Sequence, residues 1–555
     1  MKVQVLGFAS ILCVASAGLA RSALADGESP YLTVSDPGNC TLLVNGEAAS
    51  FGEIPYFEET VVKLVPNSGY EFIGWNGAVP FGTATNNPIT IKAGKVRTIS
   101  AMVRTYVKPQ LRENFLGAAG AWTAGSMIWQ GRVMPGPNDD VVIDGNNGAN
   151  HAITATGFIT CKSLTLKNKA KVLIATGNNM SVGGYKGTAA LKGLPDSNLE
   201  AVSLLIKGDL KIESGSQLAV GGQNWCDTAN NYYDYLSSPY RSDVRIGGNV
   251  TIEGSGSKML VCAGPIDENF TPQTGCGFLT VEGCLAIASG SSLYLASEGY
   301  TGGSVFVRAA SVDLAEGGAI NADCRGFTGQ KQANQNYLST QAPGLGYGTA
   351  KGGGYGGPGY IGSWNVAKCP EGYGSTYGNA IAPLLPGSPS GMNGNPNYRM
   401  AAAGGGLVRV RAASMNLAGT VTANGDREYL VNSTGGVEKY GYGASGGGIW
   451  LTTSTKALTI APTASLLAKG GNANFDAAHG GGGRIAITKN INDETEKYMA
   501  ENGAFPKKRR VRDIDQFHEA YPGVTVDVSS PGGEANKGTF AYVDGTDYGL
   551  CIILR

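Results

Sequence analysis

The sequence carries little charge, and its two signs balance. Only 15% of the 555 residues are charged, with 43 Lys plus Arg against 43 Asp plus Glu, where roughly 25% is usual. The formal net charge of zero produces no global field that would attract nucleic acid, so no nucleic-acid partner is expected. Histidine is scarcer still, with three residues. A site built on a histidine cluster is therefore not expected.

Long apolar runs are missing after the first residues. Lys2 precedes an apolar run over 5–20, and Ala23-Leu24-Ala25 has the small residues of a cleavage site. We predict a signal peptide over residues 1–25 and a mature chain beginning at Asp26. No later run is long enough to span a bilayer, so no membrane span is expected. The predicted location is extracellular or at a bacterial cell surface.

Cysteine is present, but without the spacing of metal ligands. No two of the ten cysteines are separated as in CxxC, so no zinc site is expected and no cofactor is predicted. Cys262 and Cys276 flank one loop. A disulfide between these two is left open, because sequence does not fix cysteine connectivity.

Glycine, in contrast, is abundant, at 85 of 555 residues, which is about twice the usual share. Glycine weakens each helix that it enters. The composition therefore favours an all-β chain with many tight turns and little helix.

A short block recurs along the chain. Residues 204–220 (LLIKGDLKIESGSQLAV) align without a gap to 279–295 (LTVEGCLAIASGSSLYL), and 244–261 fits after one inserted residue. Each block has three short stretches of alternating apolar residues, separated at Gly and then at Gly-Ser. Three strands per coil, with stacked coils covering one another's apolar side, predict a parallel β-helix, a solenoid. We expect a right-handed one over residues 121–555.

The start of this region and its glycine triplets carry a resemblance. Trp122, Trp129 and the run 135–143 (PGPNDDVVI) are similar to the opening segment of secreted bacterial β-helix proteins. Triplets such as 404–406 and 446–448 precede a strand, as in Gly-rich, pectin-lyase-like β-helix proteins. The resemblance implies a fold and says little about function.

Two adjacent carboxylates lie in that opening segment. Asp139 and Asp140 suit turn or capping chemistry for the first strand. A cation site is the weaker alternative, since the pair lacks further ligands nearby in the sequence.

A separate small unit precedes the solenoid, over residues 26–103. Its run 69–77 (GYEFIGWNG), followed by Asn87-Pro88 before the last strands, resembles the divergent internalin-type B-repeat of bacterial surface proteins. The resemblance implies a β-grasp-like module that serves as a spacer or binding unit without catalysis. Residues 104–120 are predicted to be a polar linker. The core of the module is expected from its aromatic residues, Tyr70, Phe72 and Trp75.

The longest excursion from the coils spans residues 326–406 and holds about twenty glycines. Insertions at one phase of a solenoid emerge on one face, often the face that binds. We expect this insertion to be dispensable for folding and to contact an extracellular or cell-wall polysaccharide. The candidate ligand-binding side chains are aromatic: Tyr347, Tyr355, Tyr360, Trp364 and Tyr373.

Two arginines recur at one place in similar coils. Arg308 lies in VFVRAAS and Arg411 in VRVRAAS. We expect them to form an outward ladder exposed to solvent.

No convergent catalytic set is evident. The β-helix pectinases carry Asn-Thr-Asp, Asp-Asp, Gly-His-Gly and Arg-Ile-Lys in order, and His479-Gly480 and Arg484-Ile485 match only parts of the last two. We therefore favour a non-catalytic, adhesin-like scaffold that contacts glycans. The alternative is a polysaccharide-degrading β-helix enzyme, a lyase or glycoside hydrolase. It would use His479, Arg484, Asp426 and Asp476.

Overall fold

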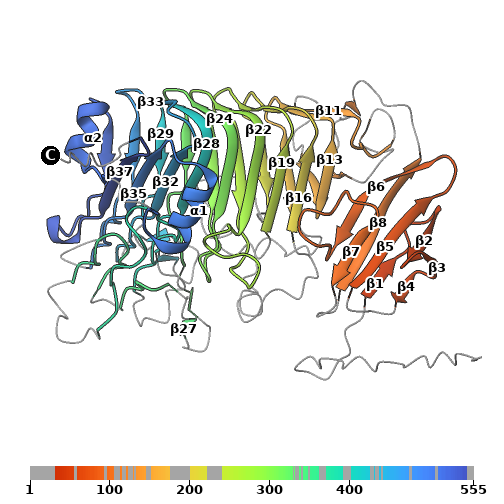
Figure 1. The fold of residues 1–555 in the computed structure, drawn as a ribbon, viewed down its shortest axis with the longest axis horizontal. Coiled ribbons are helices and arrows are strands. Elements are labelled where there is room, and N and C mark those ends of the chain that lie inside the picture. Colours follow the sequence, from red (N-terminus) through yellow and green to blue (C-terminus); the bar gives the residue numbers. More distant parts are fainter. Residues whose placement is uncertain are drawn as a thin grey trace, which may run out of the picture.

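The computed structural model describes most of the chain, with gaps. The described residues are 32–54, 59–92, 97–105, 113–114, 120–122, 129, 133–145, 152–175, 201–221, 241–328, 330–331, 337–338, 342–347, 351–361, 371–391, 402–425, 430–431, 437–438, 442–473, 478–506 and 510–546. Trp364, Asp426 and Asp476 lie outside them. Strands dominate this part of the chain (Figure 1).

The N-terminal module consists of two four-stranded sheets. One has the order β4-β1-β8-β6 and the other β3-β2-β5-β7. Alternate residues of its strands point inward around Trp75, which is fully buried and donates from Nε1 to the Asn86 carbonyl at 2.8 Å. Phe72 packs on that indole, with ring centroids 5.4 Å apart. The strands are β1 (Leu32–Ser35), β2 (Cys40–Val44), β3 (Glu47–Ala49), β4 (Gly52–Ile54), β5 (Glu59–Pro66), β6 (Tyr70–Gly77), β7 (Ile89–Lys92) and β8 (Arg97–Thr105).

The rest of the described chain builds two large sheets of parallel strands. The 15-stranded sheet contains β9 (Glu113–Asn114), β11 (Asp140–Asp144), β13 (Phe158–Cys161), β14 (Ser163–Lys167), β16 (Ala201–Ile206), β17 (Leu210–Ile212), β19 (Arg241–Ile246), β20 (Val250–Ile252), β22 (Gly277–Ile287), β24 (Val305–Leu314), β28 (Leu407–Leu417), β32 (Gly448–Thr453), β33 (Leu458–Ile460), β35 (Arg484–Lys489) and β37 (Thr539–Asp544).

The 10-stranded sheet takes one strand from each successive coil: β10 (Gly120–Ala121), β12 (Ala152–Thr156), β15 (Lys171–Ala175), β18 (Gln217–Val220), β21 (Lys258–Cys262), β23 (Ser292–Ala296), β25 (Ala319–Asn321), β29 (Thr420–Thr422), β34 (Ser465–Leu467) and β36 (Thr525–Asp527). Two short hairpins, β26 (Gln330–Lys331) with β27 (Tyr337–Leu338) and β30 (Leu430–Val431) with β31 (Val437–Glu438), stand apart from both sheets.

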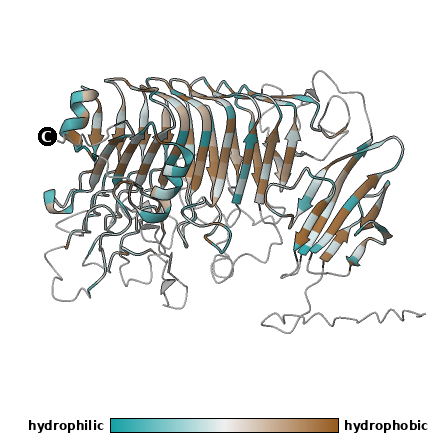
Figure 2. Ribbon diagram, viewed as in Figure 1, coloured by the Kyte–Doolittle hydropathy of each residue, from teal (hydrophilic) through white to brown (hydrophobic). Residues whose placement is uncertain are grey.

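The repeated block sets the register of the coils. Leu204 pairs with Val244, and Val244 with Leu279, as the block alignment predicts. Apolar residues in such positions form one continuous core between the two sheets, and their side chains are almost fully buried. Figure 2 shows the hydrophobic residues along the strands of the solenoid. This repeated parallel pairing is what an all-β parallel solenoid requires. The handedness of the winding and the β-grasp identity of the module stay predictions.

The 326–406 insertion interrupts the solenoid without breaking it. Strand β24 pairs directly with β28 in a continuous register, for example Arg308 with Arg411. The insertion therefore joins two coils that are neighbours in space.

Two helices, α1 (Asp493–Asn502) and α2 (Ile514–Ala520), lie between β35 and β36, and a 3-10 turn at Glu534–Asn536 precedes the terminal strand β37. In Figure 1 α1 lies across the strands of the large sheet, and α2 lies at the C-terminal end of the solenoid. Phe517 of α2 is buried against Phe540 and Tyr542 of the terminal strand β37. Among the described residues, neither helix has the length and apolarity that crossing a membrane requires.

The loop between β21 and β22 contains Cys276, for which the sequence left open a disulfide with Cys262. Cys276 is buried, and its thiol donates to the Phe270 carbonyl at 3.4 Å. It is among the cysteines that hold no disulfide. A bridge between Cys262 and Cys276 is therefore absent from this structure.

Candidate functional site

The described parts of the insertion fold into a glycine-rich lobe against the last coils. Its backbone is hydrogen-bonded to glycines far away in sequence. Gly353 donates to the Gly443 carbonyl at 3.1 Å, Gly481 donates to Gly353 at 2.9 Å, and Gly356 donates to Gly482 at 3.0 Å. These bonds lie outside the regular strands. The lobe and the coils are thus one packed structure.

The main chains of the lobe and the coils can pack this closely because glycines, which have no side chain, lie at the points of contact. A Cβ atom added to Gly480 would overlap the carbonyl oxygen of Ala444, and one added to Gly404 would overlap that of Gly387. A Cβ on Gly481 would likewise meet the Gly357 carbonyl. Main chains approach too closely here for any other residue, because a Cβ needs more than 3.0 Å from such an atom.

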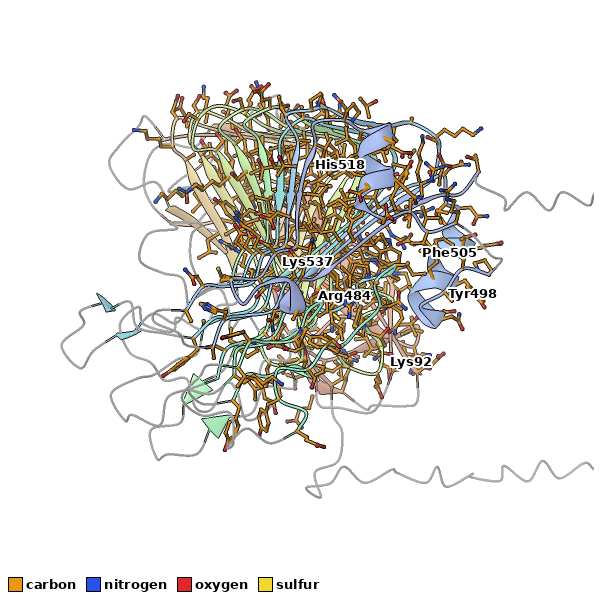
Figure 3. The ribbon with its side chains drawn as sticks, turned by 90° about the vertical axis from the view of Figure 1, so that its left-hand side faces the viewer. Lys92, Arg484, Tyr498, Phe505, His518 and Lys537 are labelled. Atoms are coloured by element: carbon orange, nitrogen blue, oxygen red, sulfur yellow. The ribbon has the colours of Figure 1, made fainter. Side chains whose placement is uncertain are left out.

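Arg484, at the start of β35, ties the lobe to the solenoid. Its Nε and Nη2 donate to the Tyr377 carbonyl at 2.9 and 2.7 Å, and Nη2 also reaches the Tyr355 carbonyl at 3.3 Å. Nη1 donates to Thr539 Oγ1 at 3.0 Å. Burial lowers the pKa of Arg484 from its ordinary value. Arg484 is 7% exposed, and Figure 3 shows it near the middle of the molecule in this view.

Tyr355 is a structural residue, which corrects its assignment as a ligand-binding side chain. The residue is fully buried, and its ring packs on that of Tyr377 with centroids 4.7 Å apart. Burial raises the pKa of both phenols. Because a sugar ring cannot reach a side chain with no exposed surface, Tyr355 supports the lobe from beneath.

The other described tyrosines of the candidate set lie at the surface of the lobe in two pairs. Tyr347 and Tyr373 meet edge to face, with ring centroids 4.8 Å apart. Tyr360 packs on His479 at 5.5 Å. All four are half-buried. The pairs belong to one small lobe, since Lys351 bridges to Tyr347 on one side and to Ile361 on the other.

His479 is held by the main chain. Its Nδ1 accepts a hydrogen bond from the Ala473 N–H at 3.0 Å, and its carbonyl accepts one from the Tyr360 N–H at 2.9 Å. These bonds fix the imidazole beside Tyr360. Of the four residues of the enzymatic alternative, the structure places His479 on the lobe surface and Arg484 in the interior. This arrangement does not present the guanidinium to a substrate.

Asp139 and Asp140 serve the docking of chain segments. Asp139 is almost fully buried, accepts from the Gly136 N–H at 2.9 Å and pairs with Arg104 at 2.6 Å. Asp140 pairs with Lys162 at 2.9 Å. Asp139 therefore has the predicted turn role, and Arg104 neutralises the charge of its carboxylate. Across the described residues, no three His, Cys, Asp or Glu side chains are grouped so that they could hold a metal ion.

Comparison with protein-family models, with curated proteins and with solved structures finds no match for this chain.

The sequence suggests that residues 326–406 are dispensable for folding, but the buried contacts of the lobe lead us to expect the opposite. Joining Arg325 directly to Leu407 would remove Tyr355 and would leave the donors of Arg484 without their carbonyl partners. We expect the deletion variant to lose cooperative thermal unfolding, measured by near-ultraviolet circular dichroism. A soluble deletion variant that melts cooperatively near the wild-type temperature would contradict this view of the lobe.

Proposed function

We propose that this protein is an exported, non-catalytic scaffold of the cell surface or extracellular space, adhesin-like, that contacts glycans through its glycine-rich lobe. The observation that carries the proposal is the pairing of half-buried aromatic rings at the lobe surface, Tyr347 with Tyr373 and Tyr360 with His479. Rings with one exposed face stack on the apolar faces of sugars at little entropic cost, because each has only two side-chain torsions.

Rigidity of the support favours binding. The lobe backbone is fixed by glycine contacts and by Arg484, so its rings are held in place before a ligand arrives. Preorganisation of this kind reduces the entropy lost on association.

A right-handed winding of the solenoid is part of the proposal, since right-handed crossovers connect parallel strands in nearly all sheets. So is a B-repeat-like module, supported by the GYEFIGWNG run.

The test is glycan-array binding of the mature chain beside a turnover assay for reducing ends and unsaturated uronates. In the variant with Tyr347→Ala and Tyr373→Ala, affinity for a bound glycan should fall roughly 5- to 30-fold, or about 1–2 kcal/mol. The matched control is Tyr498→Ala, an exposed tyrosine on α1, which should leave affinity unchanged. Unaltered binding in the double variant would overturn the assignment of this surface.

The same assay separates the enzymatic alternative. Turnover that is lost in His479→Ala and kept in Tyr498→Ala would replace the scaffold with a polysaccharide-degrading enzyme. Binding without turnover supports the scaffold.

A further inference from the structure

One row of residues on the outer face of the large sheet is covered along its whole described length. The row runs in register from β13 to β35, one residue per strand, with neighbouring members paired. Nearly all of its side chains are buried, although they point away from the solenoid core. Its members are Phe158, Ser203, Asp243, Phe278, Phe306, Arg409, Trp450 and Ala486. The N-terminal module, the loop between β21 and β22 and helix α1 cover it, together with Ala382 of the lobe, which belongs to the same buried cluster as Trp450 and Ala486.

The N-terminal module covers the first part of the row. Ile73 and Ala84 of the module form a buried cluster with Phe158 of β13. The fit is close, because a Cβ added to Gly74 would come within 2.8 Å of the Phe158 ring. An apolar contact of this kind is not made by a module that swings freely on a linker.

A buried ion pair fixes the module in one orientation. Arg104, near the end of β8, donates to Asp139 Oδ2 and to Glu71 Oε1, both at 2.6 Å, and to the Met134 carbonyl at 2.9 Å. The Arg104 and Asp139 side chains are 5% and 1% exposed. Arg104 was assigned to a polar linker on sequence grounds, but here it joins the two parts. Buried charge pairs specify one arrangement, because any other leaves a charge unpaired.

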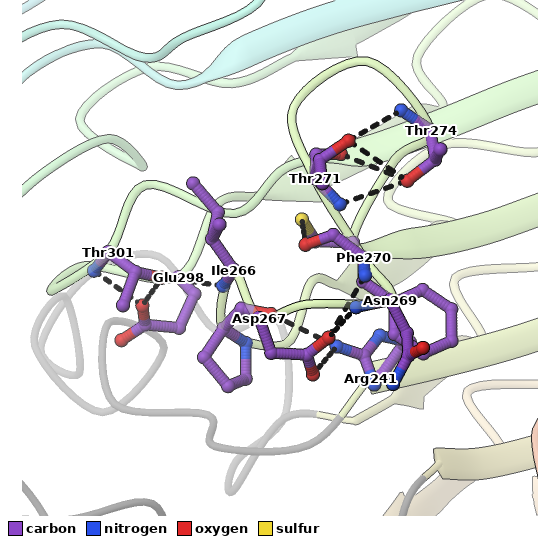
Figure 4. A network of polar contacts seen from close by, with 11 residues as sticks. Arg241, Ile266, Asp267, Asn269, Phe270, Thr271, Thr274, Glu298 and Thr301 are labelled. Atoms are coloured by element: carbon purple, nitrogen blue, oxygen red, sulfur yellow. Dashed lines mark hydrogen bonds and ion pairs between the residues drawn. The ribbon is translucent and has the colours of Figure 1, made fainter.

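The loop between β21 and β22 covers the middle of the row and contacts the module. Phe81 of the module packs on Phe270 of this loop at 5.2 Å and on Phe278 at 5.0 Å. Arg241 lies over the Phe270 ring at 3.3 Å and pairs with Asp267 at 3.0 Å, as Figure 4 shows.

The same loop is fastened at its other side by Arg409. This guanidinium donates from Nη1 to the Pro272 and Gln273 carbonyls at 3.1 and 2.8 Å. It also lies over Phe306 and bonds Glu496 of α1 at 3.1 Å. Module, loop and α1, with Ala382 of the lobe beside Trp450 and Ala486, thus cover the row.

We propose that the N-terminal module is a fixed brace of the solenoid rather than a flexible spacer, locked by Arg104 and by the Phe81–Phe270 contact. This assignment replaces the spacer role that the B-repeat resemblance implies. It is independent of glycan binding. It predicts that the mature chain is one rigid body, with the lobe held in a constant direction relative to the module.

The test measures the distance between spin labels on bio-orthogonal residues at positions 63 and 316, both exposed. The full mature chain should give one narrow distance distribution. Combining Phe81→Ala with Arg104→Met should broaden it, and the β13 amides should exchange hydrogen roughly tenfold faster. Val65→Ala, an exposed residue on the other sheet of the module, should change neither measurement.

Two outcomes would overturn the proposal. One is a broad distance distribution in the unmodified chain. The other is a narrow distribution, with β13 exchange unchanged, in the double variant. Unchanged hydrogen exchange of the β5 amides, on the other sheet of the module, confirms that the variant module is still folded, so that broadening reports undocking.

Discussion

Replacing Glu496 with glutamine should lower the free energy of unfolding by about 3–5 kcal/mol, because it leaves the buried Arg409 guanidinium without a counter-charge and Arg411 with only the exposed Asp493. Glu496 is 4% exposed on the inner side of α1. One carboxylate oxygen accepts from Arg409 Nη2 at 3.1 Å and the other from Arg411 Nη1 at 2.8 Å. Burial lowers the pKa of Arg409, and the Glu496 carboxylate opposes that shift. Asp493 also pairs with Arg411 but is largely exposed.

Urea denaturation followed by far-ultraviolet circular dichroism measures this change as a shift of the midpoint at constant slope. The control is Glu501→Gln on the same helix, whose carboxylate is half exposed and 3.9 Å from Lys497. An exposed pair of this kind contributes at most about 0.5 kcal/mol. If Glu496→Gln and Glu501→Gln gave equal stabilities, the ion cluster would not be what holds α1 to the sheet.

The burial of Arg411 in this cluster could not be predicted from the sequence. The alignment of coils correctly places Arg308 beside Arg411, but the expected exposure is right only for Arg308. Arg411 is buried because its partner arrives from a helix 85 residues further on. Period-2 patterns state which residues share a face, and they do not state what later covers that face.

The capping residues of both helices are visible in the sequence. Asn492 caps α1 by accepting from the Thr495 N–H at 2.9 Å, and Gly503 ends it in the left-handed region. Asp513 caps α2 in the same way. Start and stop residues of this type predict helix ends from sequence. The high overall glycine content obscured them, since it favours a chain with little helix.

The solenoid core was predictable because each coil repeats the same chemistry. Leu210, Val250 and Leu285 stack in register, as their alignment indicates. The glycine-rich lobe was not predictable in the same way. Its contacts are between main chains, and a residue without a side chain carries no pattern that names its partner. Tyr355 therefore resembled the surface tyrosines in sequence, although its side chain is fully buried.

Gly480→Ala tests the main-chain packing of the lobe most directly, and we expect it to destabilise the protein by about 3 kcal/mol or more. The added Cβ would overlap the Ala444 carbonyl oxygen. Relief requires movement of main chain that is hydrogen-bonded on both sides, since Gly480 donates to Gly471 at 3.0 Å and its carbonyl accepts from Ser530 Oγ at 2.7 Å.

Thermal unfolding by calorimetry, with glycan binding measured on the same samples, reports both stability and lobe geometry. The matched control is Gly208→Ala in the repeat block, where the nearest atom to the new Cβ is the Lys162 carbonyl oxygen at 3.1 Å. This control should cost less than about 1 kcal/mol, because a small shift relieves the contact. Since His479 precedes Gly480 and carries the Tyr360 contact, Gly480→Ala should also weaken glycan binding while Gly208→Ala should not. Equal melting temperatures for the two variants would show that the glycine contacts yield easily, and that the lobe is not the rigid support on which the proposed binding surface depends.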